Sequence, residues 1–404
     1  MKASTFFQSA KNRQVFTGDA RKLTCSSCGL FRDCISPRMK PFGNGSKGII
    51  NVGEAPGKDD DKAGKQWQGT EGQSLQKAYR SLGIDLFEDC ININSVNCRP
   101  LDDRAPKTKE IASCRRMVFK LIEEFKPRLI MLIGSTAVES VLGPKWGSKQ
   151  NISKWRGFRI PDRQFEAYVC PVFDSSFVER GKVLERTIWM QDLEDAFSKL
   201  NHNFPKFENE TKQVEIIKDL RPLDDIKTGP IEFDYETTGI RPFATGHRIV
   251  SCSIAYKEGH AFSFLMPKTK NELAPLVRLL ENPDIAKMAH NIKFEDVWTE
   301  VKLKTKIVNW GWDSMLAAHV LDNRSLITGL KFQTYINFGV AGYNSDVAPF
   351  LTSKEKSANA MNTIMELLKT PENTKKLLVY GGLDSIYGRR LALKQMEELG
   401  YGNV

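Results

Sequence analysis

The sequence predicts a two-domain α/β protein, and three observations lead to that prediction. The chain has 404 residues, which is more than one ordinary domain of roughly 150 residues holds. Its first half alternates short apolar runs with longer amphipathic segments, the pattern of strands and helices in a layered sheet. A polar stretch with two prolines, residues 201–228, separates this pattern from a second one. We therefore expect domains at 1–200 and 229–404, joined by a linker.

Short apolar runs supply the strands of the first domain, and we expect them at 48–52, 90–96, 129–133 and 167–173. We expect helices at 73–82 and from Thr108, a suitable N-cap residue, to the residue before Pro127. A turn rich in glycine and proline, Gly53–Gly57, follows the first run. In layered α/β sheets the loops that follow the strands carry the chemistry.

The second domain begins with a different pattern. Residues 231–236 should form a strand, and 248–266 a hairpin that turns at 257–260. We expect the remainder to be largely helical.

Charge and hydrophobicity limit the class of protein. Lys and Arg number 59 against 49 Asp and Glu, which gives a net charge of +10 and favours a polyanionic partner such as nucleic acid. The longest strongly apolar run, Leu129–Ile133, is far shorter than the ~20 residues of a membrane-spanning helix. The N-terminus has no apolar signal sequence. We expect no membrane association and a cytoplasmic location, in a bacterial or phage-infected host cell.

Eight cysteines without a signal sequence indicate metal or cluster ligation, or simple burial, rather than disulfides. Cys25 and Cys28 form a C-x2-C pair, and Cys98 and Cys114 follow at wider spacing. A zinc ribbon would use two tight pairs, so four thiolates from separate elements suit an iron–sulfur cluster better. Unrelated buried thiols are the alternative.

Three motifs near these cysteines carry a resemblance to a known family: Gly53–Asp61 (GEAPGKDDD), Gly64–Gly69 (GKQWQG) and Asn94–Pro100 (NSVNCRP). They resemble the iron–sulfur uracil-DNA glycosylases of family 4, over about residues 20–180. The resemblance implies an α/β/α glycosylase-like sandwich, and the four cysteines fall where that family holds its 4Fe-4S cluster. Cys34 is surplus to the family pattern.

The resemblance also assigns roles to single residues. Trp67 takes the position of the aromatic side chain that stacks on a flipped base, where the family usually has Phe. Asn94 takes the position that reads uracil, a task that suits an amide because it both donates and accepts hydrogen bonds. Glu54 and Asp60 hold acidic positions that help to place water or polarise the sugar.

The last family motif is altered. A His-Pro-Ser element normally follows a strand, and its His stabilises the departing uracil anion. Here the sequence reads Phe173-Asp174-Ser175-Ser176, so Asp174 occupies the His position. Two negative charges ~4 Å apart repel by roughly 4 kcal/mol at an effective dielectric near 20, or about three decades in rate. We therefore expect an impaired glycosylase step unless Asp174 is protonated or neutralised, and a module that inspects bases or holds DNA is an open alternative.

The second domain carries paired carboxylates. Asp234 and Glu236 lie two residues apart on an expected strand, so both side chains can reach one metal site. Carboxylate ligands favour Mg²⁺ or Mn²⁺. With two later elements, Ala289–Asp296 (AHNIKFED) and Tyr380–Asp384 (YGGLD), this motif resembles the proofreading 3′–5′ exonuclease domain of family A DNA polymerases. The resemblance covers about residues 228–395 and implies an RNase H-like (DnaQ-like) fold.

In that family two cations ~4 Å apart clamp the attack of water on the terminal phosphodiester. The resemblance makes Tyr380 the residue that orients this water. In the second motif, Glu295 stands where the family usually has Asp, and Asp296 lies beside it. Either acid could be the outer metal ligand, and the motif's register favours Glu295. Three carboxylates are the expected ligands of the cations: Asp234, Glu236 and Asp384.

A glycosylase-like domain in front of such an exonuclease is a phage-type arrangement, as far as the resemblance goes. The chain resembles the front part of a polymerase, split off as a subunit or cut short. We expect a metal-dependent 3′–5′ DNA exonuclease in replication or repair, which acts on single-stranded or frayed 3′ ends beside a separately encoded DNA polymerase. Two alternatives stay open, a bifunctional enzyme that also excises uracil and a non-catalytic accessory subunit of a polymerase.

Overall fold

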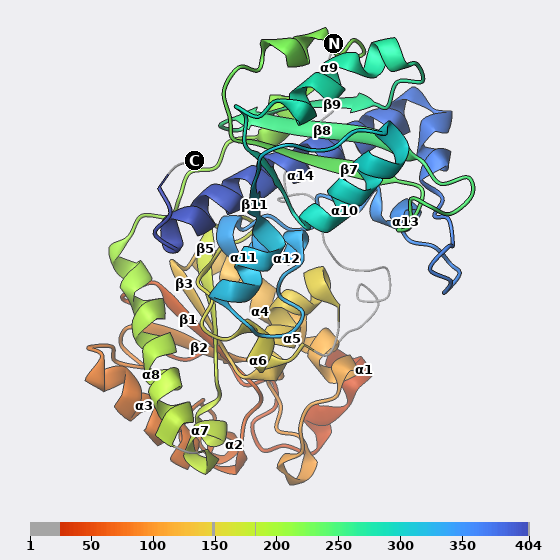
Figure 1. Cartoon of the computed structure of the whole chain (residues 1–404). Coiled ribbons are helices and arrows are strands. Elements are labelled where there is room, and N and C mark those ends of the chain that lie inside the picture. The colour runs from red at the N-terminus through yellow and green to blue at the C-terminus, as the bar shows by residue number, and fades with distance from the viewer. Residues whose placement is uncertain (1–24, 148–149, 182, 403–404) are drawn as a thin grey trace, which may run out of the picture. The chain divides into compact units, whose positions relative to one another are not determined.

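The structure is a computed structural model that describes residues 25–147, 150–181 and 183–402 (Figure 1). The expected lack of a signal sequence concerns residues that lie outside these ranges. The described chain divides into two compact units, the first up to residue 206 with 335–340, the second with 207–334 and from 341 onward. Within the described part, no helix has the length and apolar character needed to cross a membrane.

The first unit contains a sheet of five strands in the order β2-β1-β3-β5-β4, parallel except for the edge strand β4. The strands are β1 (Ile49–Gly53), β2 (Cys90–Asn94), β3 (Leu129–Ile133), β4 (Ile160–Asp162) and β5 (Ala167–Val172). The four expected strands are confirmed. The additional β4 has only three residues, too few for an apolar pattern to reveal it.

Helices cover both faces of this sheet (Figure 1). On one face, Tyr79 of α3 (Thr70–Ser81) and Leu193 of α8 (Val183–Ser198) pack into a core with Ile49 and Met131. On the other, α4 (Thr108–Phe125) packs against α5 (Ser135–Trp146). The expected α/β/α sandwich is confirmed.

The remaining helices of this unit are short: α1 (Cys25–Cys28), α2 (Lys58–Ala63), α6 (Ile152–Trp155), α7 (Ser175–Arg180) and the 3₁₀ turns Leu30–Arg32, Leu101–Asp103 and Lys199–Asn201. The expectation that Thr108 is an N-cap residue was wrong by one position. Helix α4 begins at Thr108, and Lys107 is its N-cap residue. The carboxylate of Glu110 accepts the backbone N–H of Lys107 at 2.7 Å and so replaces a capping hydroxyl.

The second unit contains a sheet of six strands in the order β11-β10-β7-β8-β9-β6. The strands are β6 (Val214–Ile216), β7 (Ile231–Thr237), β8 (Ile249–Lys257), β9 (His260–Leu265), β10 (Lys287–Ala289) and β11 (Trp310–Asp313). The expected strand and hairpin correspond to β7, β8 and β9, which pair antiparallel. The short strands β10 and β11 fall within the part that we expected to be largely helical.

Helices of the second unit are α9 (Lys270–Glu281), α10 (Ile292–Trp298), α11 (Ser314–Leu321), α13 (Ala348–Leu351) and α14 (Pro371–Glu398). Helix α12 (Leu330–Phe338) belongs to this unit only up to Thr334. Short turns complete the unit: 3₁₀ segments at Glu210–Gln213, Arg221–Asp225 and Ile364–Lys369, and a π-helical segment at Thr299–Leu303. The long helix α14 crosses one face of the sheet and contacts β7, β8 and β9 (Figure 1).

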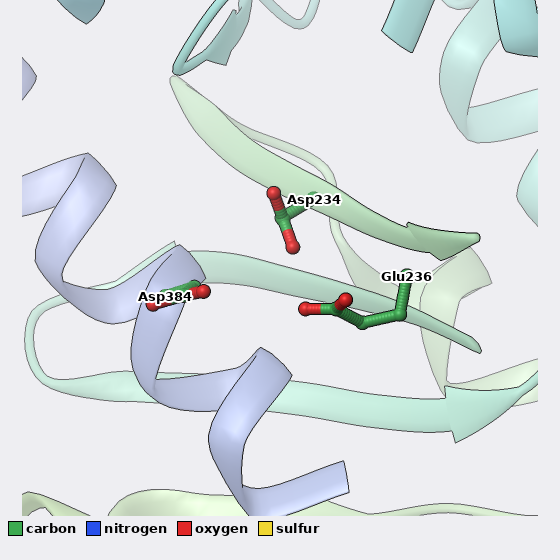
Figure 2. A group of neighbouring side chains, drawn as sticks. All are labelled: Asp234, Glu236 and Asp384. Atoms are coloured by element: carbon green, nitrogen blue, oxygen red, sulfur yellow. The ribbon is translucent and has the colours of Figure 1, made fainter. Parts of the chain in front are cut away.

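Strand β7 presents two different faces because side chains alternate along a strand. Phe233 and Tyr235 pack into the apolar core together with Leu276 of α9. Asp234 and Glu236 point the other way, toward α14 (Figure 2). This alternation sets the carboxylates of the strand against the helix that carries Asp384.

Residues 201–228 were expected to be a linker. From residue 207 onward this segment is instead part of the second unit. Val214–Ile216 pairs with β9 and extends the second sheet. Four apolar side chains of the segment are buried in the core of that unit: Ile217, Leu220, Leu223 and Ile226. They recur every third residue, a spacing that the many charges of the segment obscure.

Candidate active sites

The second unit gathers three carboxylates at one point of its sheet. Asp234 and Glu236 extend from β7, and Asp384 points toward them from α14 (Figure 2). One oxygen from each of the three lies within 4.8 Å of the others, and no other group of potential metal ligands in the described residues is this close. Carboxylate oxygens at this spacing fit divalent cations such as Mg²⁺ or Mn²⁺.

Burial makes these negative charges unfavourable unless a cation is present. Burial, followed by the charge of Asp384, raises the pKa of Asp234 to about 8. Burial and the charge of Asp234 also raise the pKa of Glu236 well above its usual value. A further buried acid, Glu232, precedes Asp234 by two residues, and its pKa is raised by burial and then by Asp234. Sequence reasoning missed Glu232, although strand alternation would have placed it on this face.

Lys331 brings a positive charge to the carboxylates. Its ammonium donates a hydrogen bond to Oδ1 of Asp384, and the hydroxyl of Tyr343 donates to the same oxygen at 2.5 Å. The Lys331 nitrogen also lies 4.4 Å from the ring centroid of Tyr380 and 4.6 Å from that of Tyr343, within the range of cation–π attraction. Neither Lys331 nor Tyr343 belongs to a recognised motif, and the sequence analysis missed both.

The second motif offers two neighbouring acids in different surroundings. Glu295 is 2% exposed, and its Oε2 has no hydrogen-bond partner. Burial and then the charge of Asp234 raise the pKa of Glu295 well above its usual value. By contrast, Asp296 accepts a hydrogen bond from the indole N–H of Trp310 at 3.1 Å. Glu295 is therefore buried with an unpartnered oxygen, whereas Asp296 is bonded to Trp310.

Asp313 holds the second motif in place. Its carboxylate accepts the backbone N–H of Ile292 at 3.0 Å, at the start of α10. It also accepts the N–H of Met315 at 2.9 Å and so caps α11. Asp313 therefore both anchors the start of α10 and caps α11.

The first unit holds a pocket of about 680 Å³ at the carboxyl ends of its strands. Loops after β1, β3 and β5 and the last residue of β2 contribute to its wall, which is where layered α/β sheets bind ligands. The pocket brings together the five residues that the resemblance selects in this unit: Glu54, Asp60, Trp67, Asn94 and Asp174.

Two buried donors at this pocket lack hydrogen-bond partners. They are Nδ2 of Asn94, a residue only 2% exposed, and the indole Nε1 of Trp67, which is 9% exposed. A buried donor without a partner costs about 1–3 kcal/mol, so a ligand with matching acceptors is favoured here. Gly53 permits this packing, because a Cβ there would lie 2.6 Å from Oδ1 of Asn94 and 2.9 Å from the ring of Trp67.

Asp174 serves as the N-cap residue of α7. Its carboxylate accepts the backbone N–H of Ser176 at 2.8 Å. Glu71 also lines the pocket, and the sequence analysis did not select it. Burial, followed by the charge of Asp174, raises the pKa of Glu71. The altered motif therefore adds negative charge to a pocket that already contains it.

The two other acids at this pocket are held by hydrogen bonds. Glu54 accepts the hydroxyl of Thr136 at 2.6 Å. Asp60 accepts the backbone N–H of Gln68 at 2.7 Å, and burial raises the pKa of Asp60. These contacts fix both carboxylates in the pocket wall.

The predicted cluster ligands lie in one region of the first unit. Cys25 and Cys28 are in α1, which packs on α4, the helix that carries Cys114. Cys98 and Cys114 are buried in one apolar cluster, against which Cys28 packs. Arg38 donates its backbone N–H to Sγ of Cys98 at 3.2 Å and its side-chain Nε–H to Sγ of Cys25 at 3.1 Å.

The chemistry of these thiols fits an iron–sulfur cluster. Burial raises the pKa of Cys98 to about 12 and that of Cys114 to about 11, so their thiolates need a bound cation at neutral pH. Among the described residues, no three of the sulfurs lie within 4.8 Å of one another. Four ligands each ~2.3 Å from one zinc ion would be closer together than that. Cys34 packs against the same apolar cluster.

Comparison with known proteins identifies the family of each half of the chain. Residues 40–197 match the family model of the uracil DNA glycosylase superfamily. A type-4 uracil-DNA glycosylase of Thermotoga maritima is 36% identical over 157 residues, which are 39% of this chain and 79% of that protein. The chain belongs to the type-4 uracil-DNA glycosylase family. Residues 204–399 match a family model described as 3′–5′ exonuclease, so the type-4 glycosylase domain is joined to a 3′–5′ exonuclease domain.

Two further proteins resemble the chain. A DNA polymerase of Bacillus phage SP01 is 24% identical over 325 residues, which are 71% of this chain and 34% of the polymerase. The chain therefore spans about a third of that polymerase's length. A solved structure of Brucella melitensis NrnC is 21% identical and covers 47% of this chain and 84% of its own, with a TM-score of 0.34.

Proposed function

We propose that this chain is a metal-dependent 3′–5′ DNA exonuclease that carries an iron–sulfur glycosylase-like domain and works in DNA replication or repair. The observation that carries the proposal is the convergence of Asp234, Glu236 and Asp384 within 4.8 Å. The match of residues 204–399 to the exonuclease family supports it. We place the boundary between the two domains near residue 206, where the compact units divide.

Bound divalent cations would activate water and neutralise the charge that develops on the leaving oxygen. Asp234, Glu236 and Asp384 would hold these cations. Glu295 would complete the site, because it is buried with an unpartnered oxygen and Asp296 is bonded elsewhere. Tyr380, buried one helical turn before Asp384, would orient the attacking water.

Surfaces beside the carboxylates suit the end of a DNA strand. A pocket of about 490 Å³ opens next to Glu236 and is lined by the apolar side chains of Ile240 and Phe294. A base can pack against such apolar side chains while its phosphate reaches the metal ligands. Single-stranded or frayed 3′ ends are therefore the proposed substrate. The similarity to a phage DNA polymerase supports association with a DNA polymerase.

We propose in addition that the first domain binds a 4Fe-4S cluster through Cys25, Cys28, Cys98 and Cys114. Their location in one region, their raised thiol pKa values and the N–H donors of Arg38 support this assignment. A bifunctional enzyme that also excises uracil is the second candidate, because the five family residues line one pocket. Asp174 counts against efficient uracil release for the electrostatic reason given above.

A nuclease assay with a 5′-labelled single strand tests the main proposal. With Mg²⁺ we expect stepwise shortening from the 3′ end, which EDTA or Asp234→Ala should abolish. Asp284→Asn, which alters an exposed carboxylate of the same unit, should retain activity. Degradation that continues in both EDTA and the Asp234→Ala variant would show that another site is responsible.

A further inference from the structure

The pocket of the first domain is strongly acidic. Its wall contains three basic side chains, Lys58, Arg104 and Arg180. Six carboxylate side chains line it as well: Glu54, Asp59, Asp60, Glu71, Asp103 and Asp174. Arg104 is already bound to Glu110 through two hydrogen bonds of 3.0 and 2.7 Å. Asp103 is likewise bound to Arg99, at 2.6 and 2.7 Å. The other carboxylates of the pocket still outnumber the two remaining basic side chains. A pocket of this charge disfavours any base that departs as an anion, as uracil does.

Two of these acids are held near each other by the packing of α7 against α3. The hydroxyl of Ser175 donates to the backbone oxygen of Glu71 at 3.0 Å. Asp174, immediately before it, is fixed by its bond to the N–H of Ser176. Burial and then the charges of Asp174, Glu179 and Glu54 raise the pKa of Glu71, and only Arg180 opposes them. The negative charge is thus built into the pocket wall.

The unpartnered donors show that the pocket can receive a flat polar ligand. Nδ2 of Asn94 and Nε1 of Trp67 have no partners, although both residues are at least nine-tenths buried. Indole is also the aromatic group that attracts cations most strongly. Trp67 stands where related glycosylases usually have Phe. Its indole ring and the negative charge of the pocket therefore both favour a positively charged ligand.

We propose that this pocket accepts a flipped purine base that carries a positive charge from N-alkylation, such as N7-methylguanine, and hydrolyses its glycosidic bond. Water would attack C1′ while its proton passes to the carboxylate of Glu54. The electron pair of the C1′–N9 bond would go to N9, which cancels the positive charge of the base. The products are a free neutral base and an abasic sugar, so no anion forms beside Asp174. This reaction needs neither the metal site nor the exonuclease activity.

Base release from matched oligonucleotides tests the proposal. Strands with one N7-methylguanine, one uracil or one unmodified guanine would be incubated with the full chain in EDTA, and free bases measured by mass spectrometry. We expect release of N7-methylguanine at least about tenfold above the protein-free rate, the size of a 1.36 kcal/mol barrier change, and little uracil. Faster release of uracil than of N7-methylguanine would overturn the proposal.

Two variants separate charge from folding. Asp174→Asn keeps a good N-cap residue but removes the charge, and we expect about tenfold slower N7-methylguanine release. Asp195→Asn removes a charge that is paired with Arg159 outside the pocket, and it should have no effect. Equal rates for Asp174→Asn and the unmodified chain would contradict the role of charge.

Binding supplies a readout that does not depend on catalysis. A strand with 2′-fluoro-N7-methylguanosine, whose glycosidic bond is stabilised, should bind more tightly than the guanine strand in EDTA. Glu54→Gln should retain this preference and lose base release, because the carboxylate that takes the proton is gone. Equal affinity for the two strands, together with no release, would overturn the pocket assignment without affecting the proposed exonuclease.

Discussion

The ammonium of Lys331 donates a hydrogen bond to Oδ1 of Asp384, the carboxylate that α14 contributes to the proposed metal site. The hydroxyl of Tyr343 donates to the same oxygen. Lys331 is therefore an internal counter-ion for carboxylates whose burial disfavours ionisation. It also competes with any cation for Asp384.

Lys331→Met should change the response of the protein to metal. Without the ammonium, the carboxylates lose their counter-ion, and we expect the metal-free protein to lose about 1–3 kcal/mol of stability. Mn²⁺ should then raise the melting temperature more than it does in the unmodified chain, because no internal cation competes. Thermal unfolding in EDTA and in MnCl₂ measures both effects. Lys268→Met, at an exposed position, is the control; an unchanged metal response in Lys331→Met would contradict the prediction.

The two acids of the second motif should differ in importance. Glu295→Gln should lower the Mg²⁺-dependent nuclease rate by about two decades or more, since it alters a buried carboxylate beside Asp234. Asp296→Asn should leave most of the activity, because the Asp296 carboxylate already accepts a hydrogen bond from the indole N–H of Trp310. Rates measured at saturating Mg²⁺ on one labelled strand decide the matter. The reverse order of effects would make Asp296 the metal-facing residue.

Strand alternation and recognised motifs account for what could be predicted of this site. Asp234 and Glu236 share a strand face, so their proximity follows from sequence alone. Lys331 and Tyr343 could not be predicted, since they lie 53 and 41 residues from Asp384 along the chain. Their contact with Asp384 arises only from the tertiary folding of the second unit, which no local pattern in the sequence reports.

Sequence motifs of the first domain selected five residues that share one pocket, but they missed Glu71, which lines the same pocket. Short motifs after the strands selected five residues that share one pocket, because loops at the carboxyl edge of a parallel sheet converge. Glu71 was missed because it lies in the first turn of a helix, where an acid is ordinary. Its place in the pocket depends on the packing of α7, which no local pattern reports.

Cysteine substitutions should distinguish cluster ligands from a bystander. Cys114→Ser should abolish the broad absorption at about 400 nm that iron–sulfur clusters give, and should lower the iron content. Cys34→Ser is the matched control, because Cys34 packs against the same apolar cluster but is surplus to the family pattern. Absorption and iron analysis of anaerobically purified protein measure both variants. A colourless unmodified protein that contains zinc would contradict the cluster assignment.

His290 should make the protein sensitive to mild acid. Burial lowers its pKa to about 4, whereas the unfolded chain has a His pKa near ~6.5. Between these values only the unfolded state binds the proton, so stability falls as pH decreases from about 6.5 to 4, by at most roughly 1.4 kcal/mol per pH unit. His290→Asn should show a shallower decline. Urea unfolding of both proteins in EDTA at several pH values checks this, and parallel stability curves would contradict it.

Asp174→His should create or raise uracil release. The substitution replaces a negative charge by a group that can stabilise the departing anion, and removal of a repulsion of roughly 4 kcal/mol corresponds to about three decades in rate. The loss of the hydrogen bond to Ser176 should cost about 1 kcal/mol of stability, which thermal unfolding would register separately. A uracil-containing strand in EDTA, followed by alkali to break abasic sites, reports glycosylase activity while the exonuclease is silent. A folded Asp174→His protein that releases no more uracil than the unmodified chain would show that the charge of Asp174 does not limit this site.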